Sequence, residues 1–555
     1  MRRAALVAAA TLLLVGTTGA LVVAAAPAPS PAPALDATQV LVLRTGSTTP
    51  QDVLDALAGL RSAPGRDGGV ALLAHAGRLD DVLEAAIADP ALDVNVLDEA
   101  DVAGAVAAVS PPQPDAGQLW IVSPGSAPGA ADLGVVVMYG TSVAEDHDVA
   151  TLTSDSTRRD GVVVAEDLLP TMRALAGLPD AGAGGAVIRP VDAPVPLDLL
   201  DRYVANRRMS VPIQTAAGLF VTFGGLLCVA LLAARGRVPP WLSSLGAWIA
   251  ISVVPLALSL LLAGHLPTLS YATVLPAVVG GTLLGTAAFV PVARARGTMT
   301  ALAWMGAATL AVFALEAALG WTAALFTFLG GTQLDGGRFY GLPNVDIGLL
   351  VGASVIAAQG LHRTAPGVAL IAAVALFAGL PFAGANLGAA VTLAATAGLW
   401  WGLRDGRGAI VTALGCLAAA GTGLVVVLLL NRYLPGPPTH IANFVEGQSD
   451  GVVPTIAHRL RTGIDLIARN PFAIVPVIGV PATLLAVLRP ADPIRASFAQ
   501  HPGWREALLT ILWGSVVAYL ANDTGAAALG LGFGTALGGL LFVSLRDRPW
   551  MMVAT

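Results

Sequence analysis

Apolar stretches of bilayer-spanning length recur along the chain from residue 209 onward. A helix needs about 20 predominantly apolar residues to cross the hydrocarbon core of a membrane. Such stretches lie at 213–234, 241–263, 270–293, 299–320, 344–361, 366–383, 386–403, 408–430, 471–488, 506–521 and 524–545. The pattern predicts that residues 209–555 form an all-α polytopic transmembrane bundle of about 11 helices.

A further apolar run opens the chain. Met1, Arg2 and Arg3 precede an almost unbroken apolar run to Ala26, and a Pro/Ala-rich linker follows at 27–34. The run fits either a cleaved signal or a membrane anchor, and its length favours an uncleaved anchor. Residues 1–35 are therefore expected to form a signal-anchor and linker.

Arginine alternates between the two sides of the predicted bundle. Basic residues concentrate in cytoplasmic loops of membrane proteins. The side predicted to be cytoplasmic carries Arg2, Arg3, Arg235, Arg237, Arg294, Arg296, Arg363, Arg404, Arg407, Arg489, Arg495, Arg505, Arg546 and Arg548, whereas the short opposite loops carry only Arg338. A longer opposite loop, 431–470, carries four more. We expect a multi-pass protein of the cytoplasmic membrane with both termini cytoplasmic and residues 36–208 extracytoplasmic.

Residues 36–208 have a different pattern, in which short β-rich runs alternate with helical ones. Strands are predicted at 39–44, 70–75, 94–98, 119–123 and 133–140, with helices after Pro50, near 78–88 and near 99–109. This alternation is typical of α/β layer folds. We expect an α/β domain around a parallel sheet.

Composition and charge support this division. The chain is 55% apolar and 12% charged, and its mean hydropathy is +0.74, which excludes an ordinary water-soluble protein. Residues 36–208 hold 25 acidic side chains and 11 Arg, a net charge of −14, whereas residues 209–555 hold 17 Arg and 11 acids, a net charge of +6. All basic residues are Arg, a composition of the kind found in GC-rich actinobacterial genomes, and it indicates no nucleic-acid partner. Cys228 and Cys416 lie in apolar runs, so no disulfide framework is expected.

The segment 151–179, TLTSDSTRRDGVVVAEDLLPTMRALAGLP, carries a specific motif. It resembles the C-terminal part of alkaline-phosphatase/sulfatase-like domains, in which a strand leads into a helix of the form D-x-x-P-T-x-x-x-x-x-G-x-P. Asp167, Pro170, Thr171, Gly177 and Pro179 match this form. The chain also resembles uncharacterised bacterial polytopic membrane proteins that carry such a domain outside the membrane. The resemblance implies a truncated phosphatase-like fold and a phosphate- or sulfate-ester ligand.

The chain departs from the metal site of that superfamily. The resemblance implies an acidic metal ligand after the first strand, but Arg44 stands there. Asp146 and His147 form a weak alternative metal site, or simply a solvated acidic loop. Arg158 and Arg159 are candidates for binding a phosphate or carboxylate, or are ordinary surface arginines. We expect a degenerate domain without catalysis and without a cofactor.

Polar residues also gather at the extracytoplasmic side of the predicted bundle. Glu316 lies near the end of its span, and a carboxylate in hydrocarbon is costly, so it should face protein or water. The next loop, 330–348, carries Asp335, Arg338, Tyr340, Asn344 and Asp346. Residues 338–344 resemble an R-Y-Y-G-I-G-N-E motif of the same uncharacterised proteins, although Pro343 and Val345 depart from it.

Other polar residues fall at the same predicted level. These are Asn386, His440, Asn522 and Asp523. A shared binding pocket explains them, and so does the preference of Asn, Asp and Gly for turns. Residues 452–470 are predicted to form an amphipathic helix, which either lies in the interface near anionic lipid headgroups or packs on the bundle as a loop helix.

These patterns give three hypotheses of function. The first is a cell-envelope membrane protein that binds a phosphorylated or polyprenyl-linked envelope component, such as a lipid-linked glycan, through a non-catalytic phosphatase-like domain and a membrane pocket. The second is a metal-dependent phospho- or sulfotransferase or hydrolase, against which Arg44 argues. The third is a secondary transporter or flippase. Membrane lipids are partners in each case.

Overall fold

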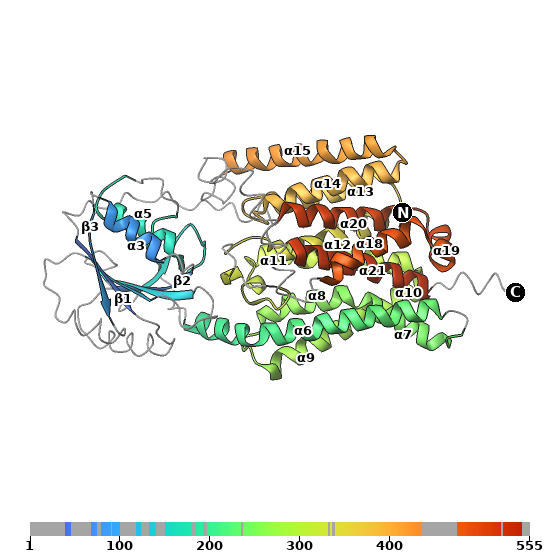
Figure 1. Ribbon diagram of the computed structural model, residues 1–555, viewed down its shortest axis with the longest axis horizontal. Helices are drawn as coiled ribbons and strands as arrows, with labels where there is room; N and C mark the ends of the chain where they lie inside the picture. The colour runs from blue at the N-terminus through green and yellow to red at the C-terminus, as the bar shows by residue number, and fades with distance from the viewer. Residues whose placement is uncertain are drawn as a thin grey trace.

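The structure of the chain is a computed structural model that combines a β-sheet with a larger helical bundle (Figure 1). It describes residues 39–45, 68–74, 79–89, 92–99, 118–123, 133–139, 150–179, 185–191, 197–234, 237–330, 333–335, 339–434, 474–522 and 525–546. The predicted anchor at 1–26, the helices after Pro50 and near 99–109, and the interfacial helix at 452–470 lie outside these residues.

The five strands predicted from the sequence are present, and three short strands join them in one eight-stranded sheet. The strands are β1 (Gln39–Thr45), β2 (Gly68–Ala74), β3 (Asp93–Glu99), β4 (Gln118–Ser123), β5 (Leu133–Tyr139), β6 (Ala150–Thr153), β7 (Val162–Val164) and β8 (Arg189–Val191). Their order is β3-β1-β4-β5-β2-β6-β8, with β7 also paired to β2.

The expectation of a parallel sheet is wrong for part of this arrangement. β1 pairs in parallel with β3 and β4, as predicted. β5 instead runs antiparallel to both β4 and β2, and β8 runs antiparallel to β6. The sheet is therefore mixed. Alternating hydrophobicity identifies a strand but not its direction, and this explains the error.

Two helices cover one face of the sheet beside β6, the strand that precedes Arg158 and Arg159. They are α3 (Leu79–Ala88) and α5 (Leu168–Leu175), the second preceded by the 3₁₀ turn η2 (Ala165–Asp167). Leu83, Leu152, Val163, Leu168 and Met172 belong to the core between these helices and the sheet, each 3% exposed or less. The strand followed by a helix expected for residues 151–179 is thus observed. We call residues 39–191 the sheet domain.

Helix α6 (Leu197–Ala233) connects the sheet domain to the bundle without a break (Figure 1). Its 37 residues make it about 55 Å long at 1.5 Å per residue, well beyond the length of a bilayer core. Its first turns are fixed at the end of the bundle nearest the sheet, where Arg202 donates to the Gly264 carbonyl (2.7 Å) and Asn206 to the Phe326 carbonyl (2.7 Å). These hydrogen bonds hold the start of α6 against the bundle.

The bundle follows α6, and each of the eleven predicted apolar stretches contains a helix. Its helices are α7 (Pro240–Ile251), α8 (Val253–Leu262), α9 (Tyr271–Ala288), α10 (Val290–Arg296), α11 (Thr298–Ala318), α12 (Ile347–Gln359), α13 (Thr364–Gly379), α14 (Leu387–Arg404), α15 (Ala409–Tyr433), α18 (Ile474–Leu488), α19 (Asp492–Gln500), α20 (Trp504–Ala521) and α21 (Gly525–Arg546). Short 3₁₀ turns connect them: η3 (Ala263–His265), η4 (Ala323–Phe326), η5 (Gln333–Asp335) and η6 (Asn344–Asp346).

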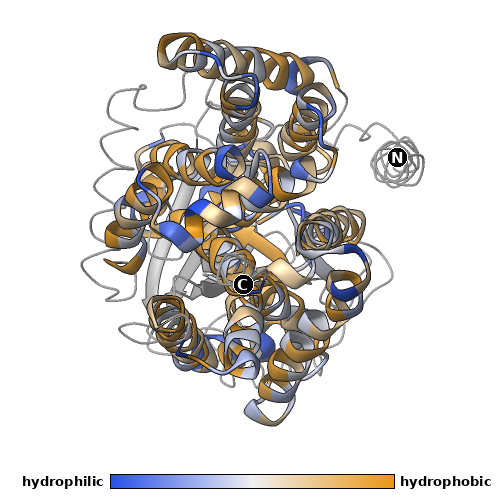
Figure 2. Ribbon diagram, turned by 90° about the vertical axis from the view of Figure 1, so that its right-hand side faces the viewer, coloured by the Kyte–Doolittle hydropathy of each residue, from blue (hydrophilic) through white to orange (hydrophobic). Residues whose placement is uncertain are grey.

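Fewer helices than predicted have the length and hydropathy of a span. Among the described residues, five single helices qualify, or up to seven when the bent pairs α7–α8 and α18–α19 each count as one. The other predicted stretches form shorter or less apolar helices, such as the 13-residue α12. The helices nevertheless make the chain a multi-pass membrane protein by length and hydropathy, and apolar residues predominate over their ribbons (Figure 2).

Small residues permit close packing at the centre of the bundle. A Cβ added at Gly348 of α12 would lie 1.8 Å from the Ala528 carbonyl oxygen of α21, and one at Gly306 would lie 2.5 Å from the Ala353 carbonyl oxygen. Such approaches between helix backbones are a common basis of helix association in membranes. Large apolar side chains remain exposed on peripheral helices, including Leu284 of α9 (74%) and Ile410 of α15 (77%), as lipid contact requires.

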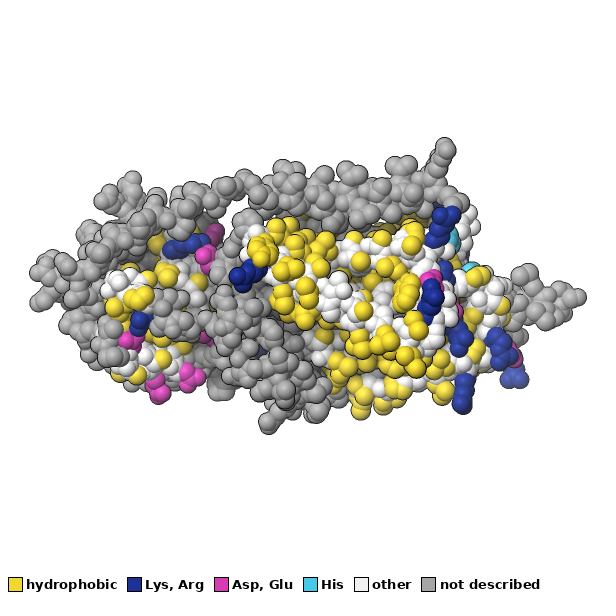
Figure 3. All heavy atoms as spheres, turned by 90° about the horizontal axis from the view of Figure 1, so that it is seen from above, with side chains coloured by type: hydrophobic (Ala, Val, Ile, Leu, Met, Phe, Trp, Pro, Cys, Tyr) yellow, Lys and Arg dark blue, Asp and Glu magenta, His cyan; other side chains and the backbone are white. Residues whose placement is uncertain are grey.

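The two ends of the bundle differ in charge. Arg side chains gather at the end away from the sheet (Figure 3), where Arg296, Arg404 and Arg546 are the last residues of α10, α14 and α21. The other end, which we call the sheet-facing end, carries the loops between α11 and α12 and between α13 and α14 (Figure 1).

Candidate binding site at the sheet-facing end of the bundle

A turn that follows β6 positions the predicted arginine pair. Asp167 braces this turn as a buried acceptor: Ser154 and Ser156 hydroxyls donate to its carboxylate at 2.6 Å each. The Val164 and Ala186 backbone N–H groups also donate to it, at 3.0 and 2.8 Å. Burial raises the pKa of Asp167, and these four hydrogen bonds oppose the rise. Asp167 thus serves to shape this loop.

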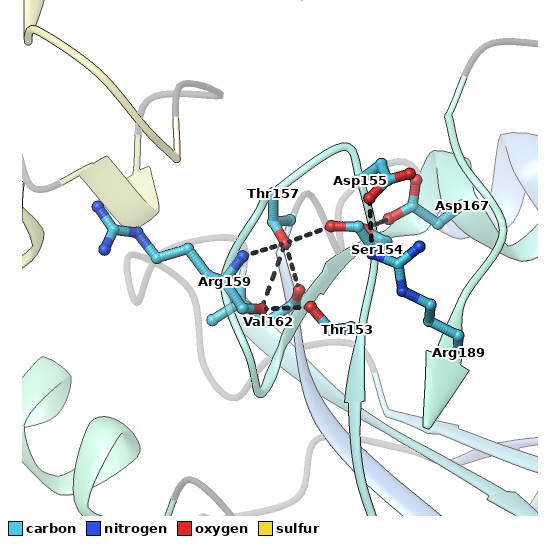
Figure 4. Close-up of polar contacts among 8 residues, drawn as sticks. All are labelled: Thr153, Ser154, Asp155, Thr157, Arg159, Val162, Asp167 and Arg189. Carbon is cyan, nitrogen blue, oxygen red and sulfur yellow. Dashed lines mark hydrogen bonds and ion pairs between the residues drawn. The ribbon is translucent and has the colours of Figure 1, made fainter. Parts of the chain in front are cut away.

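The braced turn directs Arg159 away from the sheet (Figure 4). Thr157 donates to the Val162 carbonyl (2.6 Å) and closes the turn. Arg158 has a left-handed backbone, φ 52°, which is uncommon for a residue with a side chain. Arg189, in contrast, forms an exposed ion pair with Asp155 (2.8 Å) on the surface of the sheet domain.

Arg159 inserts into the sheet-facing end of the bundle. Its Nε donates to the Phe339 carbonyl (2.6 Å) and its Nη2 to the Trp321 carbonyl (3.3 Å) and to Gln333 Oε1 (2.9 Å). Burial lowers the pKa of Arg159 to about 10, and the charge of Glu316 opposes that shift. Arg159 stays charged at neutral pH, so this contact places a cation at the junction of the sheet domain and the bundle.

Arg158 makes a second contact across the same junction. Its Nη1 donates to the Pro381 carbonyl (3.0 Å), and its guanidinium lies 4.0 Å from the centroid of the Tyr340 ring. Burial lowers its pKa. The two arginines therefore join the sheet domain to two loops of the bundle, one before α12 and one before α14.

Glu316 lies beneath this junction and is 1% exposed. It forms an ion pair with His265 of η3 and accepts from the Ala323 backbone N–H at 3.2 Å. Gln333, which receives Arg159, donates in turn to the Gly341 carbonyl (2.7 Å). The predicted Glu316 thus faces protein, and its electrostatic partners come from three separate segments.

Asn386 organises the two loops that receive the arginines. Its Nδ2 donates to the Leu342 carbonyl and to Asn344 Oδ1, both at 2.9 Å. Its Oδ1 accepts from the Ala389 N–H (3.0 Å) and caps α14. Gly341 is required beside it, because its φ is +77° and an added Cβ would lie 2.3 Å from the Gly384 carbonyl oxygen. These contacts fit the turn explanation for Asn386, and the shared binding pocket stays a prediction.

Asp346 and Asn522 are buried nearby. Among the described residues, neither forms a hydrogen bond with Arg158 or Arg159. Asp346 is 2% exposed, and its Oδ2 has no hydrogen-bond partner. Asn522 donates to the Ala518 carbonyl of its own helix (3.0 Å). A Cβ at Gly388 would lie 2.2 Å from Asn522 Oδ1, so Asn522 packs against the start of α14.

Several predicted residues fall outside the description. Arg338, His440, Asp523, Asp146 and His147 lie outside the described residues. Asp335 ends η5 and Arg44 lies in β1, where their backbones alone are described. Among the residues that are described, no group of three His, Cys, Asp or Glu side chains is placed to hold a metal ion.

The sequence interpretation missed three members of the junction: His265, Trp321 and Gln333. Trp321 donates from Nε1 to the Ala383 carbonyl (2.7 Å) and so links the α11–α12 loop to the α13–α14 loop. Gln333 lies in the polar loop 330–348, which was identified from the sequence. The polar residues around Gln333 could therefore have identified it as a candidate. His265 and Trp321 had no such signal, because each is a single residue at the end of an apolar stretch.

No family model matches this chain, and neither the curated proteins nor the solved structures compared with it give a match. The class of protein that fold and hydropathy define is a multi-pass membrane protein with a sheet domain docked at one end.

Proposed function

We propose that this is a multi-pass protein of the bacterial cell envelope that binds a phosphorylated or polyprenyl-linked component at the sheet-facing end. In this proposal that end is extracytoplasmic, and the sheet domain is a non-catalytic phosphatase-like module. The observation that carries the proposal is the junction itself. Arg158 contacts Tyr340 (4.0 Å) and Arg159 contacts Phe339 and Gln333, so groups of both parts meet at this junction.

The chemistry of the junction supports this class of ligand. A lipid-linked headgroup needs polar partners at the level where the apolar bundle ends, next to surface that its chain can follow. Tyr340 and Asn344 supply aromatic and hydrogen-bonding groups there, and Tyr433, at the end of α15, is 75% exposed. Tyr is enriched at membrane–water interfaces. The phosphate class comes from the resemblance of residues 151–179 alone.

The direct test is identification of lipids that co-purify with the full chain in mild detergent, by mass spectrometry. We expect a polyprenyl phosphate or lipid-linked glycan in wild type and in Arg189→Gln, which removes only the exposed ion pair with Asp155. We expect its loss in Tyr340→Ala. Retention of the same lipid in Tyr340→Ala, or a complete absence of such lipids in wild type, would contradict the proposal.

Two buried carboxylates favour a second candidate, a cation-coupled transporter. Glu316 and Asp346 are 1% and 2% exposed in a membrane protein, and buried ionisable groups of this kind often mark ion pathways. Proteoliposomes containing wild type would then show a substrate flux that depends on an ion gradient, and Asp346→Asn would abolish it. Flux that is absent, or unchanged by Asp346→Asn, would remove this candidate.

A further inference from the structure

A second cluster, at the end of the bundle away from the sheet, has Arg404 at its centre. The Arg404 guanidinium lies 5.2 Å from the centroid of the Trp400 ring, on its own helix α14. Among the described residues its one hydrogen bond is to the His362 carbonyl, at 3.5 Å. The adjacent Asp405 pairs with Arg407 instead (3.7 Å). Arg404 therefore retains several N–H donors and has no carboxylate partner in the described part of the chain.

The N-terminus of α20 meets this guanidinium. Gly503 is the N-cap of α20, with φ +83° and no side-chain cap. A Cβ at this position would lie 1.2 Å from Nη1 of Arg404, so the glycine makes room for the cation. The first N–H groups of a helix lack partners within it and carry partial positive charge. Arg404 thus lies against the start of α20, whose first turn also contains Glu506.

The N-terminus of α13 approaches from the other side. Its preceding residues, His362 and Arg363, are exposed, and His362 is the residue whose carbonyl holds Arg404. A Cβ at Gly367, in the first turn of α13, would lie 2.4 Å from Trp400 Nε1. This indole nitrogen is buried and has no hydrogen-bond partner in the described structure. A buried donor without a partner is unusual, and here it lies by the same helix end.

We propose that Arg404 and the two helix N-termini, of α13 and α20, bind the phosphate of an anionic phospholipid headgroup. Helix N-termini bind phosphate through free N–H groups, and a guanidinium is suited to phosphate recognition. Arg363, the N-cap of α13, and Arg505, in the first turn of α20, add positive charge around the site. Exposed apolar side chains next to it, Ile410 (77%) and Val411 (46%) at the start of α15, provide surface for the acyl chains.

Native mass spectrometry of the purified full chain, titrated with phosphatidylglycerol or with neutral phosphatidylcholine, tests this site. Wild type is expected to bind phosphatidylglycerol preferentially. Arg404→Gln is expected to weaken that binding by about fivefold, the effect of one basic residue at a membrane surface. Arg294→Gln is the matched control, because Arg294 is an exposed arginine of α10 at the same end of the bundle, and it should bind as wild type does.

Two outcomes would overturn the assignment. One is equal binding of both lipids to wild type, and the other is unchanged phosphatidylglycerol binding by Arg404→Gln. A third such outcome is that inorganic phosphate binds as tightly as phosphatidylglycerol and displaces it. The ligand of the site would then be a soluble anion and not a lipid. If Arg404→Gln does not fold, Arg404→Lys keeps the charge but loses the planar fork, and a loss of binding smaller than fivefold is then expected.

Discussion

Replacement of Arg159 by Gln should release the sheet domain from the bundle. The change removes three hydrogen bonds made by a cation, to Phe339, Trp321 and Gln333. It also removes the positive charge that offsets buried Glu316. Hydrogen bonds to charged groups contribute about 1.5–3 kcal/mol each, but desolvation of the buried guanidinium opposes them. A net loss of about 3 kcal/mol in docking free energy is the expected result.

Hydrogen–deuterium exchange measures this release. A loss of about 3 kcal/mol raises the undocked population about 100-fold, because each 1.4 kcal/mol is a factor of ten. Exchange should accelerate in residues 150–165 and 321–342, while the interior of α14 keeps its protection. Arg189→Gln is the control, because its ion pair with Asp155 is exposed and contributes at most about 1 kcal/mol. Equal deuterium uptake in Arg159→Gln and wild type at both segments would refute the reasoning.

Three further changes test the supports of the junction. Asp167→Asn should lower the free energy of unfolding by about 1–3 kcal/mol, because an amide nitrogen would face donor groups. Burial raises the pKa of Asp167, so its contribution is fully present below the unfolded pKa, about 4, and is lost as pH rises through the folded pKa. Melting curves taken upward from about pH 4 in which the difference from Asp167→Asn does not shrink would contradict this. Gly341→Ala should lower the free energy of unfolding by about 2–4 kcal/mol, because the φ of this residue is +77° and an added Cβ would clash with the Gly384 carbonyl. An unchanged melting temperature would contradict this prediction. Asn386→Ala should cost about 2–3 kcal/mol, because it removes a helix cap and two donated bonds; a Ser replacement, which keeps the cap, should recover part of that loss.

Local patterns predicted the elements of this protein well, because hydrophobic periodicity is set by which face of each element is buried. Strands such as Gln39–Thr45 and Gly68–Ala74, and the helix Leu79–Ala88, lie where the pattern placed them. The direction of β5 was beyond the pattern, since it depends on how connections cross the sheet. Among the described residues, fewer helices than predicted reach the length and hydropathy of a span, because stretches such as 344–361 contain a turn before a short helix.

The candidate site was predicted in its components and not in its connections. The polar loop around Tyr340 and Asn344, the Arg158–Arg159 pair and Asn386 were each identified from the sequence. Their meeting joins residues 180 positions apart in the chain, as in the bond from Arg159 to Phe339. A single sequence contains no signal for such a contact. The pair that was expected to hold a ligand anion is engaged with backbone carbonyls of the bundle.

The most direct test of the central claim, that the arginine turn docks on the bundle, is photo-crosslinking from position 340. Benzoylphenylalanine would replace Tyr340, whose ring lies 4.0 Å from the Arg158 guanidinium, and irradiated protein would be digested and sequenced by mass spectrometry. Docking predicts a crosslink to the peptide that contains residues 157–160, reduced in Arg159→Gln. Crosslinks confined to the bundle in wild type would contradict docking.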